Sequence, residues 1–229
     1  MAEPHEHSRR LLVIFDCDGV LVDSERIAIR IDVEVIRRHG WNITEQEVID
    51  LFVGRSDGFM RSEVARRTGR DLGPDWDNAF VNDYRAALAR ELQPVDGVVA
   101  ALDAIERLGL PTCVASSGSH DKMRFTLGLT DLWDRFDGRI FSASEVERGK
   151  PAPDLFLHAA RQMDYAPDAC CVIEDSAAGV EAAIAAGMRV FAYAGGVTSR
   201  ARLERPGVVV FDTMAELVGL IEASSRLGA

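Results

Sequence analysis

A run of five large apolar residues, Leu11 to Phe15, ends abruptly in two carboxylates, Asp16 and Asp18. A continuous apolar run of this length is typical of a strand buried on both faces, as in a parallel sheet covered by helices. Ligands of such sheets bind beyond the carboxyl ends of the strands. Because Asp16 and Asp18 are two positions apart, strand alternation directs both carboxyl groups into one cavity. Two close carboxylates repel each other, so the pair predicts a divalent metal with oxygen ligands.

Two other short apolar runs of the chain also end in polar side chains. The first stops at a pair of serines, whose hydroxyl and backbone donors suit an anion such as phosphate. The second stops at two carboxylates, just before a helix of small residues. Since crossovers of one hand bring the carboxyl ends of parallel strands together, we expect all these side chains to converge. The residues that follow the runs 112–115 and 170–173 are, in order, Ser116, Ser117, Glu174 and Asp175.

Lysine usage is the second informative feature of the sequence. Of 26 basic residues, only Lys122 and Lys150 are lysines. Lys150 precedes Pro151 and Pro153, which fix the backbone and keep the lysine segment extended. The ammonium group is a compact point charge, which suits a phosphoryl group. An ordinary surface loop is the alternative interpretation of this segment.

The residues from Asp16 to Ser24 resemble the signature Asp-x-Asp-x-[Thr/Val]-Leu-x-Asp-Ser of the haloacid dehalogenase superfamily, with every motif position filled. The segment from Lys150 to Pro153 resembles the superfamily's Lys-Pro-x-Pro motif. Members of this superfamily are mostly magnesium-dependent phosphatases and phosphomutases. The resemblance covers nearly the whole chain and implies an α/β fold with a doubly wound, Rossmann-like parallel sheet in the order 5-4-1-2-3. We expect five main strands, the last two at 189–193 and 208–211.

The resemblance also implies a role for each site residue. Asp16 would attack phosphorus and form an aspartyl-phosphate. Asp18 would act as general acid and then as general base, which requires its pKa to be raised by the neighbouring carboxylates. Lys150 would complete the catalytic set, and Ser116 and Ser117 would bind the phosphate. The implied ligands of Mg²⁺ are Asp16, Asp18, Glu174 and Asp175.

Between residues 24 and 94 the pattern changes from strands to helices. Four segments with helical periodicity follow one another, punctuated by glycines. We therefore predict an α/β core domain of residues 1–23 and 95–229 and an inserted helical cap domain of residues 24–94. This placement resembles the subgroup of beta-phosphoglucomutase-like and phosphoglycolate phosphatase-like enzymes, whose caps close over the site. The predicted cap helices are 25–39, 44–52, 58–68 and 75–91.

Cap residues favour a phosphatase over a mutase. In beta-phosphoglucomutase-like enzymes a cap histidine lies ten residues after the second aspartate and a cap lysine contacts phosphate, whereas this chain has Ala28 there and no lysine in 24–94. Arg55 and Lys122 are candidate specificity residues, Arg55 because a guanidinium fork grips a carboxylate or second phosphate. The stretch 113–123 resembles sugar-phosphate or phosphogluconate phosphatases. The alternatives are a phosphomutase and a non-catalytic binding or regulatory protein on the same fold.

The formal net charge of −11 argues against nucleic acid and anionic membranes as partners, because both require basic surfaces. We expect a small phosphorylated metabolite as the partner and a monomer or weak dimer as the assembly. No apolar stretch approaches the roughly 20 residues of a membrane span, and the first residues lack the apolar region of a secretory signal. All four cysteines lie in or beside predicted central strands and are interpreted as reduced, so we expect a cytoplasmic location.

Overall fold

The computed structural model describes residues 11–53, 57–73 and 75–226. Within them a sheet of six strands has the order β3-β2-β1-β4-β5-β6, and every neighbouring pair is parallel. The α/β fold class is confirmed. The strands are β1 (Leu12–Phe15), β2 (Thr112–Ser116), β3 (Ile140–Ser142), β4 (Cys170–Glu174), β5 (Arg189–Tyr193) and β6 (Val208–Phe211).

One strand of the sheet is missing from the sequence prediction. β3 has only three residues, too few to give a strand pattern, and it pairs with β2 at one edge. If β3 is counted as the third strand, β4 and β5 become the fourth and fifth. Read from β5 to β3, these five strands have the expected order 5-4-1-2-3. β6 adds a sixth strand at the opposite edge, so the expected number of five main strands is wrong.

The sheet is covered on both faces, as the continuous apolar runs predict. Val13 and Phe15 of β1 belong to one buried cluster, and Leu12 and Ile14 to a second, because successive side chains of a strand point to opposite faces. The first cluster includes residues of α5 (Val98–Arg107), α6 (His120–Leu129) and α10 (Met214–Arg226). The second includes residues of α7 (Asp154–Gln162), α8 (Ala177–Ala185) and α9 (Arg200–Leu203). Among the described residues, three short 3-10 helices complete the core: Trp133–Arg135, Ala143–Glu145 and Pro167–Ala169.

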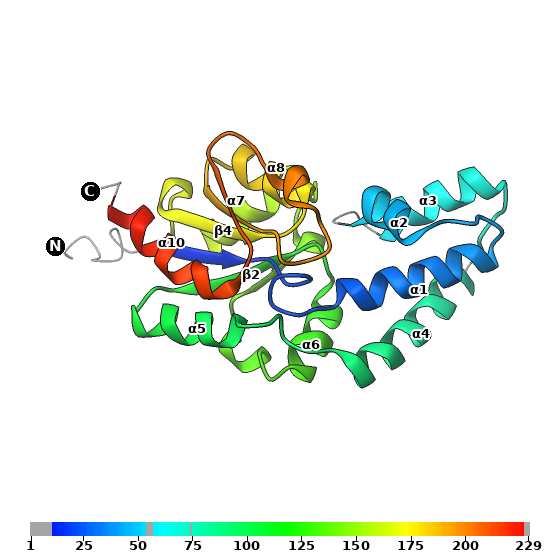
Figure 1. Ribbon diagram of the computed structural model, residues 1–229, viewed down its shortest axis with the longest axis horizontal. Coiled ribbons are helices and arrows are strands. Elements are labelled where there is room, and N and C mark those ends of the chain that lie inside the picture. Colours follow the sequence, from blue (N-terminus) through cyan, green and yellow to red (C-terminus); the bar gives the residue numbers. More distant parts are fainter. Residues whose placement is uncertain (1–10, 54–56, 74, 227–229) are drawn as a thin grey trace.

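Four helices between β1 and α5 form a cap on the strand ends to which β1 points (Figure 1). Each differs from its predicted range by at most one residue. α1 packs against both α2 and α4, and α2 begins with a capping box between Thr44 and Glu47. The division of the chain into domains at residues 24 and 94 stays a prediction. The cap helices are α1 (Glu25–Arg38), α2 (Glu45–Phe52), α3 (Asp57–Thr68) and α4 (Asp75–Glu91).

The two connections between core and cap run side by side. Asp23 donates its backbone N–H to the carbonyl of Gln93, and Val95 donates to the carbonyl of Leu21. Val22 and Pro94 form an antiparallel bridge at the same point. This pairing anchors the entry to α1 directly beyond the loop that carries Asp16 and Asp18. Among the residues that the structure describes, no helix is long and apolar enough to cross a membrane.

Candidate active site

A cavity of about 760 Å³ lies between the strand ends and the cap. We call its two sides the core floor and the cap wall. The core floor consists of residues at the ends of β1, β2 and β4 and of the lysine loop: Asp16, Asp18, Ser116, Lys150, Glu174 and Asp175. The cap wall consists mainly of residues of the four cap helices: Ala28, Ile29, Asp32, Phe52, Met60, Trp76, Tyr84 and Leu88.

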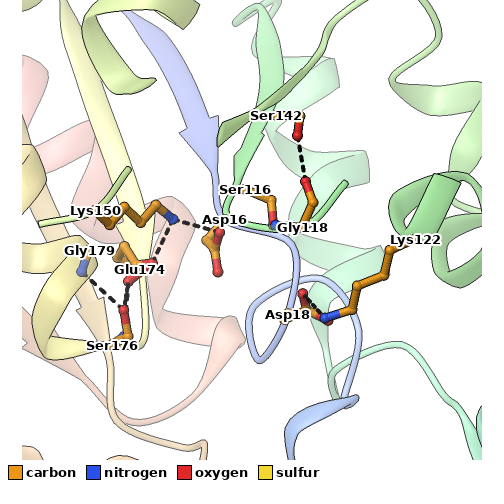
Figure 2. A network of polar contacts seen from close by, with 10 residues as sticks. All are labelled: Asp16, Asp18, Ser116, Gly118, Lys122, Ser142, Lys150, Glu174, Ser176 and Gly179. Atoms are coloured by element: carbon orange, nitrogen blue, oxygen red, sulfur yellow. Dashed lines mark hydrogen bonds and ion pairs between the residues drawn. The ribbon is translucent and has the colours of Figure 1, made fainter. Parts of the chain in front are cut away.

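Lys150 joins two carboxylates of the core floor. Its Nζ donates to Asp16 Oδ1 at 2.7 Å and to Glu174 Oε1 at 3.0 Å, and all three residues are buried (Figure 2). Burial raises the pKa of Asp16 to about 7, although the charge of Lys150 acts in the opposite direction. Burial acts to lower the pKa of Lys150, but Asp16 and Glu174 outweigh it and hold that pKa above its ordinary value. The core floor therefore keeps a fixed ammonium charge beside Asp16.

Glu174 is held by the start of α8. Its Oε2 accepts hydrogen bonds from the backbone N–H of Ser176 at 2.9 Å and from the Ser176 hydroxyl at 3.0 Å. The same Ser176 oxygen accepts from the N–H of Gly179 at 3.0 Å, which caps the helix. A Cβ at Gly179 would lie 2.0 Å from the carboxyl carbon of Glu174, so only glycine fits. The small-residue helix thus lets its first turn approach and fix a buried carboxylate.

Asp18 is engaged by two donors from different parts of the chain. The Ser24 hydroxyl donates to its Oδ1. The Nζ of Lys122 donates to its Oδ2 at 2.9 Å (Figure 2). Burial acts to raise the pKa of Asp18, but Lys122 and Ser24 outweigh burial and bring the pKa below its ordinary value. The expectation that neighbouring carboxylates raise this pKa is therefore wrong. Lys122 also lies 5.6 Å from the ring of Tyr84 on α4, so its ammonium bridges core and cap.

Asp175 carries the clearest signal of a cation site. Both of its carboxylate oxygens are buried, and no described residue donates a hydrogen bond to them or to the buried Oε2 of Glu25. Burial first, and Glu25 next, raise the pKa of Asp175 well above its ordinary value, and burial raises the pKa of Glu25 to about 8. Asp16, Glu174 and Asp175 each offer an oxygen within 4.8 Å of the others. Crowded acceptor-only groups of this kind fit a hard divalent cation such as Mg²⁺.

Gly19 lets the motif loop approach this carboxylate cluster. Its φ is +77°, a conformation that side chains disfavour, and a Cβ there would lie 2.1 Å from Asp175 Oδ2. The backbone of the loop from β1 therefore lies directly against Asp175. This close approach brings the backbone of Asp18 next to the cluster as well.

The predicted phosphate residues lie in the same cavity. Ser116 is buried, and its Oγ accepts from the backbone N–H of Gly118 at 3.1 Å. Ser117 is exposed and also lines the cavity. The Ser142 hydroxyl at the end of β3 donates to the carbonyl of Gly118 at 2.7 Å, which ties the serine loop to the edge strand. Ser119 caps α6 and so places Lys122 one turn into the helix.

Several residues of the cavity are absent from the predicted site. Glu25 and Asp32 belong to the predicted helix 25–39 but not to the predicted site. Together with Ala28 they line the cavity at the spacing of one helix face, which is the signal that could have identified them. The cap specificity candidate Arg55 lies outside the described residues.

Comparisons with known proteins find relatives that cover most of this chain. The profile of the haloacid dehalogenase-like hydrolase family matches residues 11–187. 6-Phosphogluconate phosphatase of Escherichia coli K12 is 33% identical over 94% of this chain and 96% of that protein. Hexitol phosphatase A of the same organism is 30% identical over 78% of this chain and 81% of that protein. A haloacid dehalogenase-like protein from Agrobacterium tumefaciens, of solved structure, has a TM-score of 0.80 and 33% identity, covering 93% of this chain and 98% of its own.

Proposed function

The chain belongs to the haloacid dehalogenase-like hydrolases, and on that premise we propose that it is a magnesium-dependent phosphatase of small sugar phosphates. One observation carries the proposal: buried Asp16 is paired with Lys150 and lies beside the donor-free carboxylate of Asp175. A nucleophilic oxygen, a fixed positive charge and a cation site thus meet at one point. Relatives named as a phosphogluconate phosphatase and a hexitol phosphatase support sugar phosphates as the substrate class.

In the proposed first step an oxygen of Asp16 attacks phosphorus in line, and the bond between phosphorus and the ester oxygen breaks. Asp18 donates a proton to the leaving alkoxide. In the second step Asp18 removes a proton from water, the water oxygen attacks the aspartyl-phosphate, and phosphate leaves with Asp16 regenerated. The lowered pKa of Asp18 fits the second step directly. In the first step, movement of the Lys122 ammonium onto a substrate phosphate oxygen would remove the main contact that lowers it.

Electrostatic stabilisation would come from groups already in place. Lys150 and the hydroxyl and amide donors of the serine loop, Ser116 and Ser117, would bind the equatorial phosphoryl oxygens. Asp16, Glu174 and Asp175, with the Asp18 carbonyl, would hold Mg²⁺, whose charge neutralises the phosphoryl oxygens. The cap would exclude water from the cavity while the phosphoryl group transfers.

The two alternatives have less support. A phosphomutase needs cap groups that hold the second phosphate, whereas Ala28 lines the cavity where the related mutases have a histidine, and the chain has no cap lysine. A non-catalytic protein has no need to keep the whole arrangement. Here Asp16, Asp18, Lys150 and Asp175 all face the same cavity.

A phosphate-release screen tests the proposal. The purified protein is incubated with Mg²⁺, a chromogenic phosphate ester and a panel of phosphorylated sugars, sugar alcohols and sugar acids. We expect release that stops on chelation and is restored by Mg²⁺ but not by Ca²⁺, whose looser coordination misplaces the nucleophile. Turnover after exhaustive chelation, or no release from any ester, contradicts the proposal. Conversion of a sugar 1-phosphate to its 6-phosphate without release indicates the mutase instead.

A further inference from the structure

Glu25 brings a carboxylate of the cap to the floor of the cavity. It is the first residue of α1 and lines the cavity. Its Oε2 is buried, and no described residue donates a hydrogen bond to it. A Cβ at Gly19 would lie 2.1 Å from Asp175 Oδ2 and 3.0 Å from the carboxyl carbon of Glu25, so the two carboxyl groups lie side by side. Asp175 itself is fully buried, and both of its oxygens lack a donor among the described residues.

The contact between Glu25 and Asp175 is unfavourable when both carboxyl groups are ionised. Burial raises the pKa of both groups, and Glu25 is the next cause for Asp175. Both lysines of the chain donate hydrogen bonds to other carboxylates of the floor. A divalent cation in the adjacent site would supply the positive charge that the pair requires.

Glu25 fits a place just outside the direct ligands of such a cation. Asp16, Glu174 and Asp175 each offer an oxygen within 4.8 Å of the others, and Glu25 does not belong to this group. Mg²⁺ in proteins usually keeps several of its water ligands. An ionised carboxylate only accepts hydrogen bonds, so Glu25 can accept one from a water of this hydration shell.

The start of α1 is held by the floor of the cavity rather than by its own helix cap. The N-cap residue Ser24 makes no capping hydrogen bond with its side chain, and its hydroxyl donates to Asp18 instead. From this point α1 runs outward into the cap (Figure 1). An attachment of Glu25 to the cation site would therefore hold the first turn of the helix that leads into the cap.

We propose that Glu25 is a further residue of the cation site and couples cation binding to the anchoring of the cap helix α1. The inference rests on the cation site of the proposed phosphatase and adds a residue outside its direct ligands. With the cation bound, a water of its shell links Glu25 to the floor. Without the cation, the ionised carboxyl groups repel each other and the first turn of α1 opens more readily. Glu25 is thus a positioning residue.

Calorimetric titration of the substrate-free protein with Mg²⁺ tests the role of Glu25 in the cation site. Glu25→Gln keeps the size of the side chain and removes its charge. We expect the Kd of Mg²⁺ to rise by about tenfold or more, the usual effect of losing an outer partner of a metal site. The increase in thermal midpoint on adding a fixed concentration of Mg²⁺ should become smaller. Glu25→Ala, whose side chain makes no new polar contact, should change the Kd in the same direction.

The control variant is Glu34→Gln on the same helix. Glu34 is exposed and pairs with Arg38 outside the cavity, so this variant removes the same charge away from the cation site. We expect its Kd for Mg²⁺ to equal that of the wild type. Thermal unfolding in a chelator checks that all variants are folded.

Hydrogen exchange tests the coupling to the cap helix. The amide of Ala28 donates to the carbonyl of Ser24 in the first turn of α1. The matched control is the amide of Ala101, which donates to the carbonyl of Gly97 in the first turn of α5, a helix that does not line the cavity. At about ten times its Kd, Mg²⁺ should slow exchange at Ala28 relative to Ala101 by up to about tenfold in the wild type. In Glu25→Gln, measured at the same multiple of its own Kd, this relative slowing should be lost.

The outcomes separate the inference from the proposed function. An unchanged Kd in Glu25→Gln overturns the role of Glu25 in the cation site. Equal relative slowing of exchange at Ala28 in the wild type and in Glu25→Gln overturns the coupling to the cap helix. If the wild type does not bind Mg²⁺, both the inference and the proposed function fail. If the wild type binds Mg²⁺ but releases phosphate from no ester, the proposed function alone fails, and the binding and exchange measurements still decide the inference.

Discussion

The core floor and the cap wall of the same cavity are built in different ways. Every charged group of the floor follows a strand end or belongs to the loop of Lys150, and hydrogen bonds fix Asp16, Asp18 and Glu174 in place. The wall consists mainly of aromatic and aliphatic side chains on the cap helices, with Asp32 as its carboxylate. The backbone of the sheet thus positions the charged groups of the floor, whereas helix side chains form the wall.

The two sides also differ in their electrostatic cost. Burial raises the pKa of Asp16 and Asp175 of the floor and of Glu25 at the start of α1, so without a cation the carboxyl groups gathered here resist ionisation. The wall buries apolar surface, which stabilises the fold at about 25 cal/mol per Å². The carboxyl groups of the floor therefore lower the stability of the folded protein, as reactive groups of functional sites commonly do. Variants of the two sides should consequently change different quantities.

Asp16→Asn should have the largest effect on the floor. The amide keeps the shape of the side chain but is not a nucleophile, so we expect kcat to fall by about 10⁴-fold or more. The free energy of unfolding should stay the same or increase, because one buried charge leaves a repelling cluster. Phosphate release and denaturant unfolding measure the two quantities. Near-normal release by this variant would show that Asp16 forms no covalent intermediate.

Asp18→Asn should separate the two chemical steps. With an alkyl phosphate we expect kcat to fall by roughly 10²-fold or more, the usual scale of general acid catalysis. Nitrophenolate leaves without taking up a proton, so the variant should still form the aspartyl-phosphate from a nitrophenyl ester. The attack of water on that intermediate should be slow. Rapid-mixing measurements should then give a burst of about one nitrophenolate per protein. The role of Asp18 is wrong if the alkyl ester is turned over normally.

The pH dependence of stability should show that the floor requires a cation. The folded-state pKa values of Asp16 and Glu25, about 7 and about 8, lie above the ordinary values of 3.8 and 4.5. Between these limits the folded protein binds more protons than the unfolded chain, so stability is lost as pH rises. We expect the thermal midpoint in a chelator to fall by about 3 °C or more from pH 6 to pH 8.5.

Mg²⁺ should remove most of this fall in the thermal midpoint, because its charge, like bound protons, reduces the repulsion between the carboxylates. Asp175→Asn should flatten the pH profile in the chelator, since it removes a carboxyl group whose own pKa is raised well above its ordinary value, by burial first and by Glu25 next. A midpoint that rises with pH in the metal-free protein would contradict this account of the floor.

The sequence predicts the floor because its geometry follows from strand pattern and topology. β1 and β4 are buried along their whole length, so their apolar runs are long enough to recognise. Parallel pairing then brings Asp16 and Asp175 to one edge of the sheet without knowledge of any contact. β3 is not predicted, because a strand of three residues is too short to show a periodic pattern.

The sequence does not predict contacts between segments that are far apart in the chain and outside the paired strands. Lys122 is 104 positions from Asp18, and no local pattern indicates that its ammonium reaches that carboxylate and lowers its pKa. Asp32 and Tyr84 look like ordinary positions of amphipathic helices. Only the packing of α1 against α4 turns both toward the cavity.

Arg202→Ala should have the smallest effect, because it acts on the link between cap and core. Arg202 of α9 donates to Asp50 Oδ1 at 2.7 Å and to the Asp50 carbonyl at 3.3 Å, at the end of α2. The pair is half exposed, so its contribution is about 0.2–1 kcal/mol and weakens with salt. We expect KM for the preferred metabolite to rise by up to about fivefold at low salt. Arg200→Ala is the matched control, since Arg200 pairs with Asp212 within the core. Equal effects of the two variants would show that the Arg202 contact plays no part in holding the cap wall over the core floor.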